Sequence, residues 1–390
     1  MHLLESPIRS EELLGKTINI KYRFYASSSE PLQLKELLVM ADQNNDHQLI
    51  EAYHDHSLGY ADSGGSLDLR QQIATLYGDN ISASNIVVFP GAQTGMTLSA
   101  QALLHKGDHA IVITPSYQSL EESAKLAGCE ISRVSLSPDT NWQLDIADVE
   151  ATIQKNTRYI TLNDPHNPSG ALLDYDTKLA LIGLAEKYDL LIFSDEVYRL
   201  LELNPSERSP SMAELSARAI ALSTMSKPWG AGGTGIGWVV CQDSVICSQL
   251  LQAQHIYAVC FSRAGEIQAM MALRCSTEII NKNLTIIARN LALLKQYFDL
   301  NSDLFDWVAP RAGGTGFVRF KGPITANQLA EQLLENEILV FPSSIFDCDE
   351  NLGQYFRIGF SRTTMPAALD AFKRYVQNQR SVWQTQIAES

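Results

Sequence analysis

Short apolar runs alternate with segments of helical period from about residue 85 to 242 of this chain. The runs are continuous and end at Gly, Pro, Asn or Asp, which is typical of strands covered on both faces of a parallel sheet. The predicted strands are Ile86–Phe89, His109–Thr114, Tyr159–Leu162, Leu190–Phe193, Ala219–Leu222 and Ile236–Val240, and the predicted helices are Ala92–Leu104, Leu120–Ala127 and Thr177–Tyr188. This order predicts an α/β fold.

The remaining pattern predicts two further parts. A long helical stretch over Ser262–Leu300 closes the large domain, and a smaller α+β unit follows with strands Phe317–Phe320, Ile338–Phe341 and Tyr355–Phe360 and helix Ala326–Asn336. The chain up to about residue 45 is too short to fold alone. We therefore expect an N-terminal segment over 1–45 that packs with the small domain and covers the active site, a large domain over 46–290 and a small domain over 291–390.

The composition limits the classes of binding partner that we expect. The chain has 390 residues, 45% of them hydrophobic and 19% charged, as in ordinary globular proteins. Its 30 basic and 44 acidic residues give a net charge of −14, which argues against nucleic acid or an anionic membrane as the main partner. Small molecules are the better expectation. Solubility explains the negative charge more readily than a cationic substrate such as a guanidine does.

The six cysteines form no C-x-x-C pair and show no metal-like spacing, so we expect reduced thiols and no metal site. The N-terminal residues lack a basic region followed by an apolar run, and no stretch approaches the length of a membrane span. These features favour a cytoplasmic protein.

Lys227 stands in a glycine-rich segment that runs from Ser223 to Trp238. A lysine forms an imine with an aldehyde only when part of its amine is unprotonated, which burial beside other groups permits. The segment alone is equally consistent with a solvated lysine in a loop. Motifs upstream of it favour the reactive lysine.

Two of these motifs directly follow predicted strands, beyond whose carboxyl ends α/β proteins bind ligands. The turn Gly91–Gly95 opens a helix, so its free N–H groups and the helix dipole could hold a phosphate. Such a turn is more often a plain connection. Tyr117 offers a face on which a flat ring could stack, although in isolation a packed surface tyrosine is the commoner case.

Two other motifs carry more information. Asn167 stands between Pro165 and Pro168, which fix the local backbone and suit a side chain that makes one defined hydrogen bond, although turn chemistry alone would also explain them. Asp195 directly follows an apolar strand, and a buried carboxylate is costly unless a cation or hydrogen bonds stabilise it. A protonated pyridine nitrogen would be a suitable cation.

The ordered set P-x-N-P-[ST]-G, D-E-x-Y and S-K ahead of G-W resembles the fold-type I pyridoxal phosphate enzymes of the class I/II aminotransferase family, over roughly residues 55–365. The resemblance implies an aspartate aminotransferase-like fold with a mostly parallel central sheet. It implies that Lys227 holds the cofactor as an imine and then moves the Cα proton, and that Asp195 pairs with the pyridine nitrogen. By the same resemblance, the ring hydroxyl is bound by Asn167 and Tyr198, the ring stacks on Tyr117, and the phosphate is bound by Ala92, Gln93, Thr224 and Ser226.

Two further residues match family positions. Tyr60 matches the tyrosine that reaches the phosphate of the neighbouring subunit, which implies a homodimer with shared active sites. Arg357 matches the arginine that clamps the substrate α-carboxylate with a bidentate fork, with Asn167 beside it. One position departs from the family pattern: the phosphate arginine eight residues after the lysine is Gly235 here. Our hypothesis is that Arg263 supplies the missing charge, across the dimer interface.

Within the family, the stretches 25–31 and 165–170 look most like capreomycidine synthase and the enduracididine-forming cyclases, which act on hydroxylated arginine. This resemblance makes Ser28, Ser29 and Glu5 candidate substrate contacts. It implies a pyridoxal phosphate enzyme of arginine-type metabolism that works as a cyclase, dehydratase or oxidase. An ordinary aminotransferase with a keto-acid acceptor is the alternative, and a non-catalytic effector-binding module is the third hypothesis.

Overall fold

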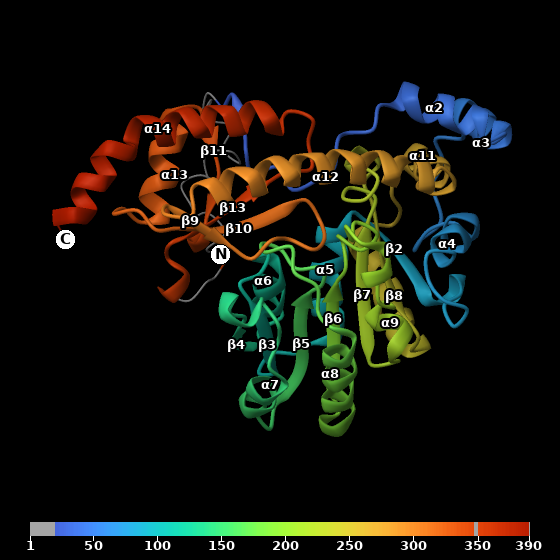
Figure 1. Cartoon of the computed structure of the whole chain (residues 1–390). Helices are drawn as coiled ribbons and strands as arrows, with labels where there is room; N and C mark the ends of the chain where they lie inside the picture. Colours follow the sequence, from blue (N-terminus) through green and yellow to red (C-terminus); the bar gives the residue numbers. More distant parts are fainter. Residues whose placement is uncertain (1–19, 347–349, 390) are drawn as a thin grey trace.

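The computed structural model describes residues 20–346 and 350–389. Two units lie below and beside the long helix α12 (Ser276–Leu300), which runs along both of them in Figure 1. One unit is built on a seven-stranded sheet and the other on a four-stranded sheet. The fold is the mostly parallel α/β arrangement that the sequence predicts.

The seven-stranded sheet has the order β2-β8-β7-β6-β5-β3-β4. Its strands are β2 (Ile86–Pro90), β3 (His109–Thr114), β4 (Glu130–Ser135), β5 (Thr157–Asn163), β6 (Leu191–Asp195), β7 (Ala219–Thr224) and β8 (Ile236–Cys241). Strands β4, β3, β5, β6 and β7 pair in parallel, whereas β8 is antiparallel to both of its neighbours. The apolar run at 236–240 is therefore covered on both faces without being a parallel strand.

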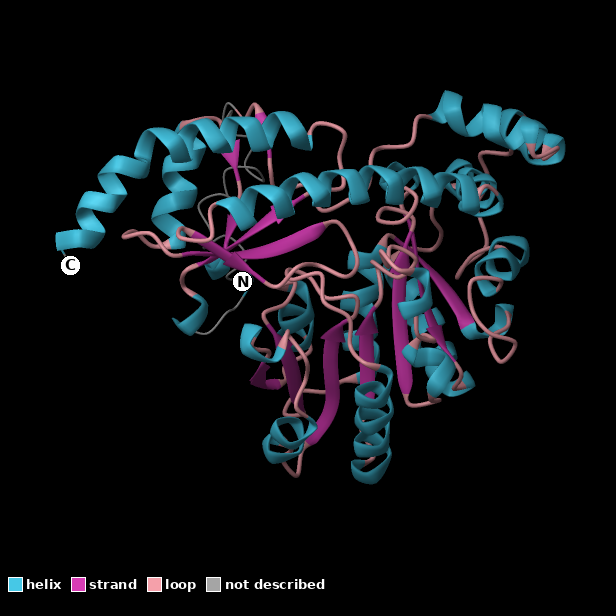
Figure 2. Ribbon diagram, viewed as in Figure 1, coloured by secondary structure: helices cyan, strands magenta, loops and turns pink. Residues whose placement is uncertain are grey.

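Helices cover both faces of this sheet (Figure 2). They are α4 (Leu67–Ala74), α5 (Ala92–Leu103), α6 (Ser119–Leu126), α7 (Ile146–Thr152), α8 (Tyr175–Tyr188), α9 (Met212–Leu215), α10 (Ser244–Tyr257) and α11 (Arg263–Arg274). The predicted single stretch 262–300 is two helices, because the chain leaves helical geometry at Cys275 between α11 and α12. The apolar period continues across the break, which is why the sequence alone does not reveal it.

The smaller unit contains an antiparallel sheet of order β12-β13-β10-β9. Its elements are β9 (Phe305–Trp307), β10 (Thr315–Phe320), α13 (Ala326–Glu335), β11 (Ile338–Leu339), β12 (Phe341–Pro342), β13 (Tyr355–Gly359) and α14 (Met365–Glu389). The predicted strand 338–341 is thus divided between two sheets. Its first half, β11, pairs in parallel with β1 (Tyr22–Arg23).

The N-terminal segment divides between the two units, which corrects part of the expectation for residues 1–45. Residues 20–30 pack with the smaller unit through the β1–β11 pair and through a hydrogen bond from Gly359 N to Phe24 O of 2.8 Å. Helix α2 (Leu34–Gln43) instead buries Leu37 and Met40 in a core cluster that also holds residues of α11, and α3 (His47–His54) follows it there. The amphipathic face of α2 explains this placement. The exact domain limits at 45 and 290 stay predictions.

The carboxyl ends of β5, β6 and β7 all open toward the smaller unit, so side chains after these strands gather where the two units meet (Figure 1). Of the cysteines that the structure describes, all five are free thiols. No helix within residues 20–346 or 350–389 combines the length and apolar character needed to cross a bilayer.

Candidate active site

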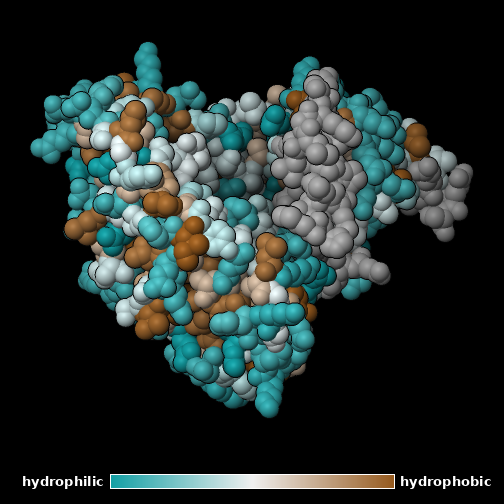
Figure 3. Space-filling model, turned by 180° about the vertical axis from the view of Figure 1, so that it is seen from behind, coloured by the Kyte–Doolittle hydropathy of each residue, from teal (hydrophilic) through white to brown (hydrophobic). Residues whose placement is uncertain are grey.

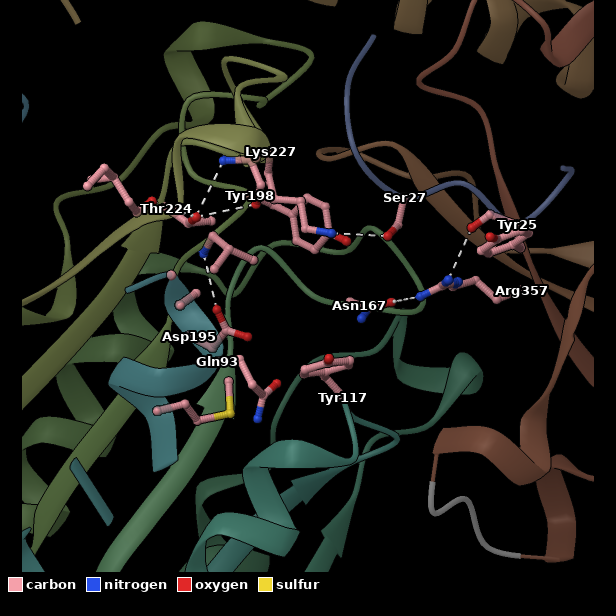
Figure 4. A pocket seen from close by; sticks show the side chains of 18 of the residues that line it. Tyr25, Ser27, Gln93, Tyr117, Asn167, Asp195, Tyr198, Thr224, Lys227 and Arg357 are labelled. Carbon is pink, nitrogen blue, oxygen red and sulfur yellow. Dashed lines mark hydrogen bonds between the residues drawn. The ribbon is translucent and has the colours of Figure 1, made fainter. Parts of the chain in front are cut away.

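A cavity of about 560 Å³ lies at the junction of the two units. Figure 4 shows its side chains converging from both sheets and from the N-terminal segment. It brings together ten of the residues predicted from the sequence: Ala92, Gln93, Tyr117, Asn167, Asp195, Tyr198, Thr224, Ser226, Lys227 and Arg357. Because these residues come from distant segments, their convergence is the strongest evidence for a functional site.

Lys227 follows the carboxyl end of β7 and points into the cavity. Its Nζ donates a hydrogen bond of 3.1 Å to Ser27 Oγ and lies 5.3 Å from the centre of the Tyr198 ring. The loop that carries it is tight, because a Cβ at Gly232 would come within 3.1 Å of Ser226 Cβ. The amine is therefore held at a defined place in the cavity.

Asp195 ends β6 and is 3% exposed. Its carboxylate accepts a hydrogen bond of 3.2 Å from Val197 N. Burial raises the pKa of Asp195 to about 7, and the hydrogen bond and the positive charge of Lys227 only partly oppose this effect. A buried carboxylate with so little compensation is suited to a cationic group bound in the cavity.

Arg357, on β13, forms the opposite wall of the cavity from the sheet unit. Its guanidinium donates to Asn167 Oδ1 at 2.9 Å and to Tyr25 O at 3.1 Å, and it lies about 5 Å from the ring centres of Phe341 and Phe346. Two aromatic faces and two hydrogen bonds fix the plane of the fork. Asn167 uses its oxygen for Arg357, so its NH₂ group is left to donate into the cavity.

The loop that carries Asn167 is anchored by buried polar contacts. Asp164 pairs with Lys178 of α8 at 2.5 Å and accepts from Leu173 N at 3.0 Å. His166 bonds Ser169 Oγ at 2.6 Å and Pro115 O at 2.7 Å, and burial lowers the pKa of His166 to about 4. The imidazole therefore stays neutral near pH 7. It links the Asn167 loop to the loop of Tyr117.

The start of α5 supplies unpaired backbone donors at the other end of the cavity. Gly91 has a φ of 85° and no side chain caps the helix, so the first N–H groups, at Ala92 and Gln93, have no partner within the helix. Strand β8 passes very close, since a Cβ at Gly237 would lie 2.5 Å from Ala92 N. Thr224 and Ser226 add hydroxyl groups to the same wall. Together these groups form a cradle suited to an anion.

Two predicted residues lie elsewhere in this subunit. Tyr60 and Arg263 line a separate surface hollow of about 450 Å³. Tyr60 is 87% exposed, whereas Arg263 pairs with the fully buried Glu266 at 2.8 Å. Neither residue lines the first cavity of its own chain.

The structure corrects the substrate contacts expected from the N-terminal segment. Ser28 accepts a hydrogen bond from Arg362, Ser29 is 1% exposed, and neither lines the cavity. Tyr25 and Ser27 line it instead. Sequence reasoning missed these two, and also Phe341, since no motif marks which face of the segment turns inward. Glu5 lies outside the described residues.

No group of three or more His, Cys, Asp or Glu side chains within the described ranges is placed to hold a metal ion.

Known proteins with similar sequences include several named as aminotransferases and one named as capreomycidine synthase. The probable aspartate aminotransferase of Methanocaldococcus jannaschii is 26% identical over 316 residues, which cover 77% of this chain and 80% of that protein. Capreomycidine synthase of Streptomyces vinaceus is 29% identical over 273 residues, 70% of this chain and 68% of the relative. An arginine–pyruvate transaminase of Pseudomonas aeruginosa is 35% identical over 196 residues, about half of each chain (49% and 50%).

A solved structure gives the same picture of the fold. A PLP-dependent aminotransferase from Streptococcus suis superposes with a TM-score of 0.87 at 25% identity, over 97% of this chain and 99% of that one. Its cofactor, pyridoxal phosphate, has an aldehyde, a basic ring nitrogen and a phosphate. Lys227, the under-compensated carboxylate of Asp195 and the cradle at Ala92 are chemically matched to these three groups. The residues present therefore fit this cofactor.

The family model for aminotransferases of class I and II matches residues 27–372, which is most of the chain and includes every residue that lines the cavity except Tyr25. The chain belongs to the class I and II aminotransferase family, and its cofactor is pyridoxal 5′-phosphate.

Proposed function

We propose that this enzyme acts at the α-amino group and Cα of an arginine-type amino acid. The observation that carries the proposal is one cavity holding both Lys227 and the fork of Arg357, with Asn167 bonded to that fork (Figure 4). An α-amino acid needs both groups: a cation for its carboxylate and a base near its Cα.

The cofactor, when bound, supplies an electron sink that makes the Cα proton of the substrate removable. Asp195 would pair with the ring nitrogen and keep it protonated, and Asn167 and Tyr198 would donate to the ring hydroxyl. Tyr117 would pack against the ring. The N–H groups at Ala92 and Gln93 and the hydroxyl groups of Thr224 and Ser226 would bind the phosphate.

Arg357 binds the α-carboxylate of the substrate with its two parallel N–H groups and so directs the Cα–H bond toward Lys227. The Lys227 amine then takes up that proton and returns it where the product requires it. Tyr25 and Phe341 close the side of the cavity next to the arginine and restrict water there.

Two observations support an arginine-type substrate. An arginine–pyruvate transaminase is 35% identical over 49% of this chain, and capreomycidine synthase is 29% identical over 70% of it. Tyr25, whose ring centre lies 4.6 Å from that of Phe341, also offers the cavity an aromatic face on which a flat guanidinium can stack. We propose a dehydration or cyclisation of a hydroxylated arginine that begins with removal of the Cα proton and expels the side-chain hydroxyl as water. In the cyclisation, a guanidine nitrogen forms the new bond to the carbon that carried the hydroxyl and gives up one N–H proton, and Cα regains a proton.

An ordinary transamination is the second candidate, because two relatives named as a probable aspartate aminotransferase and an aspartate aminotransferase match 77% and 81% of this chain. In that reaction the amino group of the substrate would end on a keto acid such as pyruvate or 2-oxoglutarate.

The proposed assembly is a homodimer in which Tyr60 and Arg263 of one copy face the cofactor phosphate of the other. The described cations on the cavity wall are Lys227 and Arg357, and the first is committed to the aldehyde while the second lies at the substrate end. Leu58, which lines the hollow that holds Tyr60 and Arg263, is an exposed apolar side chain. Ile256, Tyr257 and Val259, which shortly precede the lining residues 260–264 in the chain, are also exposed. Seen from behind, the unit built on the large sheet carries apolar side chains interspersed with polar ones (Figure 3).

The test is to load the protein with pyridoxal phosphate and to incubate it separately with L-arginine, 3-hydroxyarginine, 4-hydroxyarginine, L-aspartate and L-alanine, each with and without pyruvate. A product lighter than the substrate by one water, formed without a keto acid, supports cyclisation or dehydration. A keto-acid product whose formation needs pyruvate supports transamination instead. Reaction with aspartate or alanine but with none of the three arginine compounds would overturn the arginine-type proposal.

A further inference from the structure

The described contacts of the Lys227 amine include one hydrogen bond, and it runs to the N-terminal segment rather than to the sheet that carries the lysine. Ser27 Oγ accepts it at 3.1 Å, across a separation of 200 residues in the chain (Figure 4). No sequence motif singles out Ser27. The cavity wall includes its side chain.

The backbone around Ser27 is fixed on both sides by the segment that follows Arg357. Ser361 Oγ donates to Ala26 O at 3.3 Å and to Ser28 O at 2.8 Å, and Arg362 Nε donates to Ser28 O at 2.7 Å. A Cβ at Gly359 would come within 2.1 Å of Ala26 O, so the two segments are in direct backbone contact. The Ser27 hydroxyl therefore has a defined position relative to the cavity.

The same segment also contacts the group expected to bind the substrate carboxylate. Tyr25 O accepts from Arg357 at 3.1 Å, two residues before Ser27. Residues 25–27 thus touch both the arginine that would hold the substrate and the lysine that would move its proton. A rigid element between two such groups fixes their mutual geometry.

We propose that Ser27 is a positioning residue for the proton-transfer step, with its hydroxyl accepting a hydrogen bond from the Lys227 amine once the substrate has displaced that amine from the cofactor. A neutral amine has two N–H bonds and one lone pair. When one N–H is directed to Ser27 Oγ, fewer orientations of the amine remain, and the lone pair can face the Cα proton of a substrate held by Arg357. This role rests on the proposed function of Lys227 and Arg357.

The test compares Ser27→Ala and Ser27→Thr, with Ser28→Ala as the matched control, because the Ser28 hydroxyl bonds Arg362 and lies off the cavity wall. The wild-type protein is first incubated in D₂O with a panel of L-amino acids that includes arginine. The member whose Cα proton exchanges fastest becomes the probe. The outcome with arginine itself therefore tests the proposed substrate, and the variants test Ser27.

We expect Ser27→Ala to slow Cα exchange and kcat about 10- to 100-fold, the range typical of a lost orienting contact, with KM changed less than threefold. Ser27→Thr, which keeps a hydroxyl, should restore most of the rate. Cofactor affinity of the apoprotein, measured by fluorescence titration with pyridoxal phosphate, should stay within threefold in both variants, because Ser27 contacts the lysine and not the cofactor cradle.

Equal exchange rates in Ser27→Ala and the wild type would overturn the proposal. So would a Ser27→Ala variant whose cofactor affinity falls tenfold in step with its rate, since Ser27 would then act in cofactor binding. A rate loss shared equally by Ser28→Ala would assign the effect to the packing of the segment. Absence of exchange from every amino acid in the wild type would contradict both this role and the proposed function.

Discussion

Asp195 is a residue whose burial destabilises the apoprotein but provides a partner for the cofactor. Its pKa is raised from 3.8 to about 7 because the carboxylate is buried. A carboxylic acid whose pKa is higher in the folded than in the unfolded protein favours folding most at low pH, where it is neutral in both states. This contribution to the free energy of unfolding is fully present below about pH 4 and is lost as the pH rises through about 7. A bound pyridinium would offset the cost of burying the ionised carboxylate of Asp195 above that pH.

We therefore predict that Asp195→Asn raises the melting temperature of the apoprotein at pH 8 by at least about 3 °C and changes it little at pH 4. The same substitution should weaken pyridoxal phosphate binding at least tenfold, because it removes the partner of the ring nitrogen. Calorimetry of the apoprotein across pH and a cofactor titration check the two parts. A melting temperature lowered equally at both pH values would contradict the explanation.

Arg357 provides a second residue-scale prediction. Arg357→Lys keeps the charge but replaces a planar fork, held between Phe341 and Phe346, by a point charge. KM for the substrate should rise at least about tenfold, the equivalent of one lost charge-assisted hydrogen bond, while kcat falls less. Steady-state kinetics measures the changes in KM and kcat separately. Arg319→Lys, on the exposed face of the adjacent strand β10, serves as the control and should leave both constants unchanged.

At the scale of elements, the position of the N-terminal segment depends on close backbone contacts that no sequence pattern predicts. Gly230 has a φ of 63°, and a Cβ there would lie 2.0 Å from Glu30 O, beside the hydrogen bond from Leu32 N to Gly230 O of 3.0 Å. Gly230→Ala should displace this segment and so lower kcat/KM about tenfold or more. The reason is that Ser27 and Tyr25 would lose their places on the cavity wall.

Gly183→Ala is the matched control for that substitution. Gly183 lies on the exposed face of helix α8, and a Cβ there would meet nothing within 4 Å. The helix should gain up to about 1 kcal/mol of stability without a change in kinetics. Thermal unfolding and steady-state rates measured on both variants make the comparison. Normal kinetics in Gly230→Ala would show that the segment is not needed in its present place.

Elements with strong local patterns could be predicted from the sequence, and elements fixed by distant contacts could not. Strand β3 and helix α5 were found within a residue of their predicted limits because continuous apolar runs and a glycine turn mark them. The break at Cys275 and the division of 338–341 between β11 and β12 carry no turn signal. Likewise, motifs indicated Lys227 and Asp195, whereas the inward-facing Tyr25, Ser27 and Phe341 depend on tertiary packing.

At the scale of the whole molecule, the positive charge available to the cofactor phosphate depends on how two copies of the chain would meet. The cofactor phosphate carries about two negative charges, yet Gly235 occupies the position where the family pattern has an arginine. Within the chain, Arg263 is engaged by Glu266, whose other oxygen accepts from Ser66 N at 2.7 Å. In a dimer that brings Arg263 of one copy near the cofactor phosphate of the other, the guanidinium could bind Glu266 and the phosphate at the same time.

A mixed-dimer experiment tests that arrangement. We expect Lys227→Ala and Arg263→Ala each to lower activity as homodimers, the first because the base is lost and the second because the phosphate loses its cation. If Arg263 acts in trans, a hybrid of one subunit of each kind has one site with both residues intact, so mixing the refolded variants should restore activity that neither has alone. Titration of pyridoxal phosphate into each mixture reports the same site independently of turnover. If the two variants stay inactive when mixed while size measurements show that hybrids form, Arg263 acts within its own subunit or not at all.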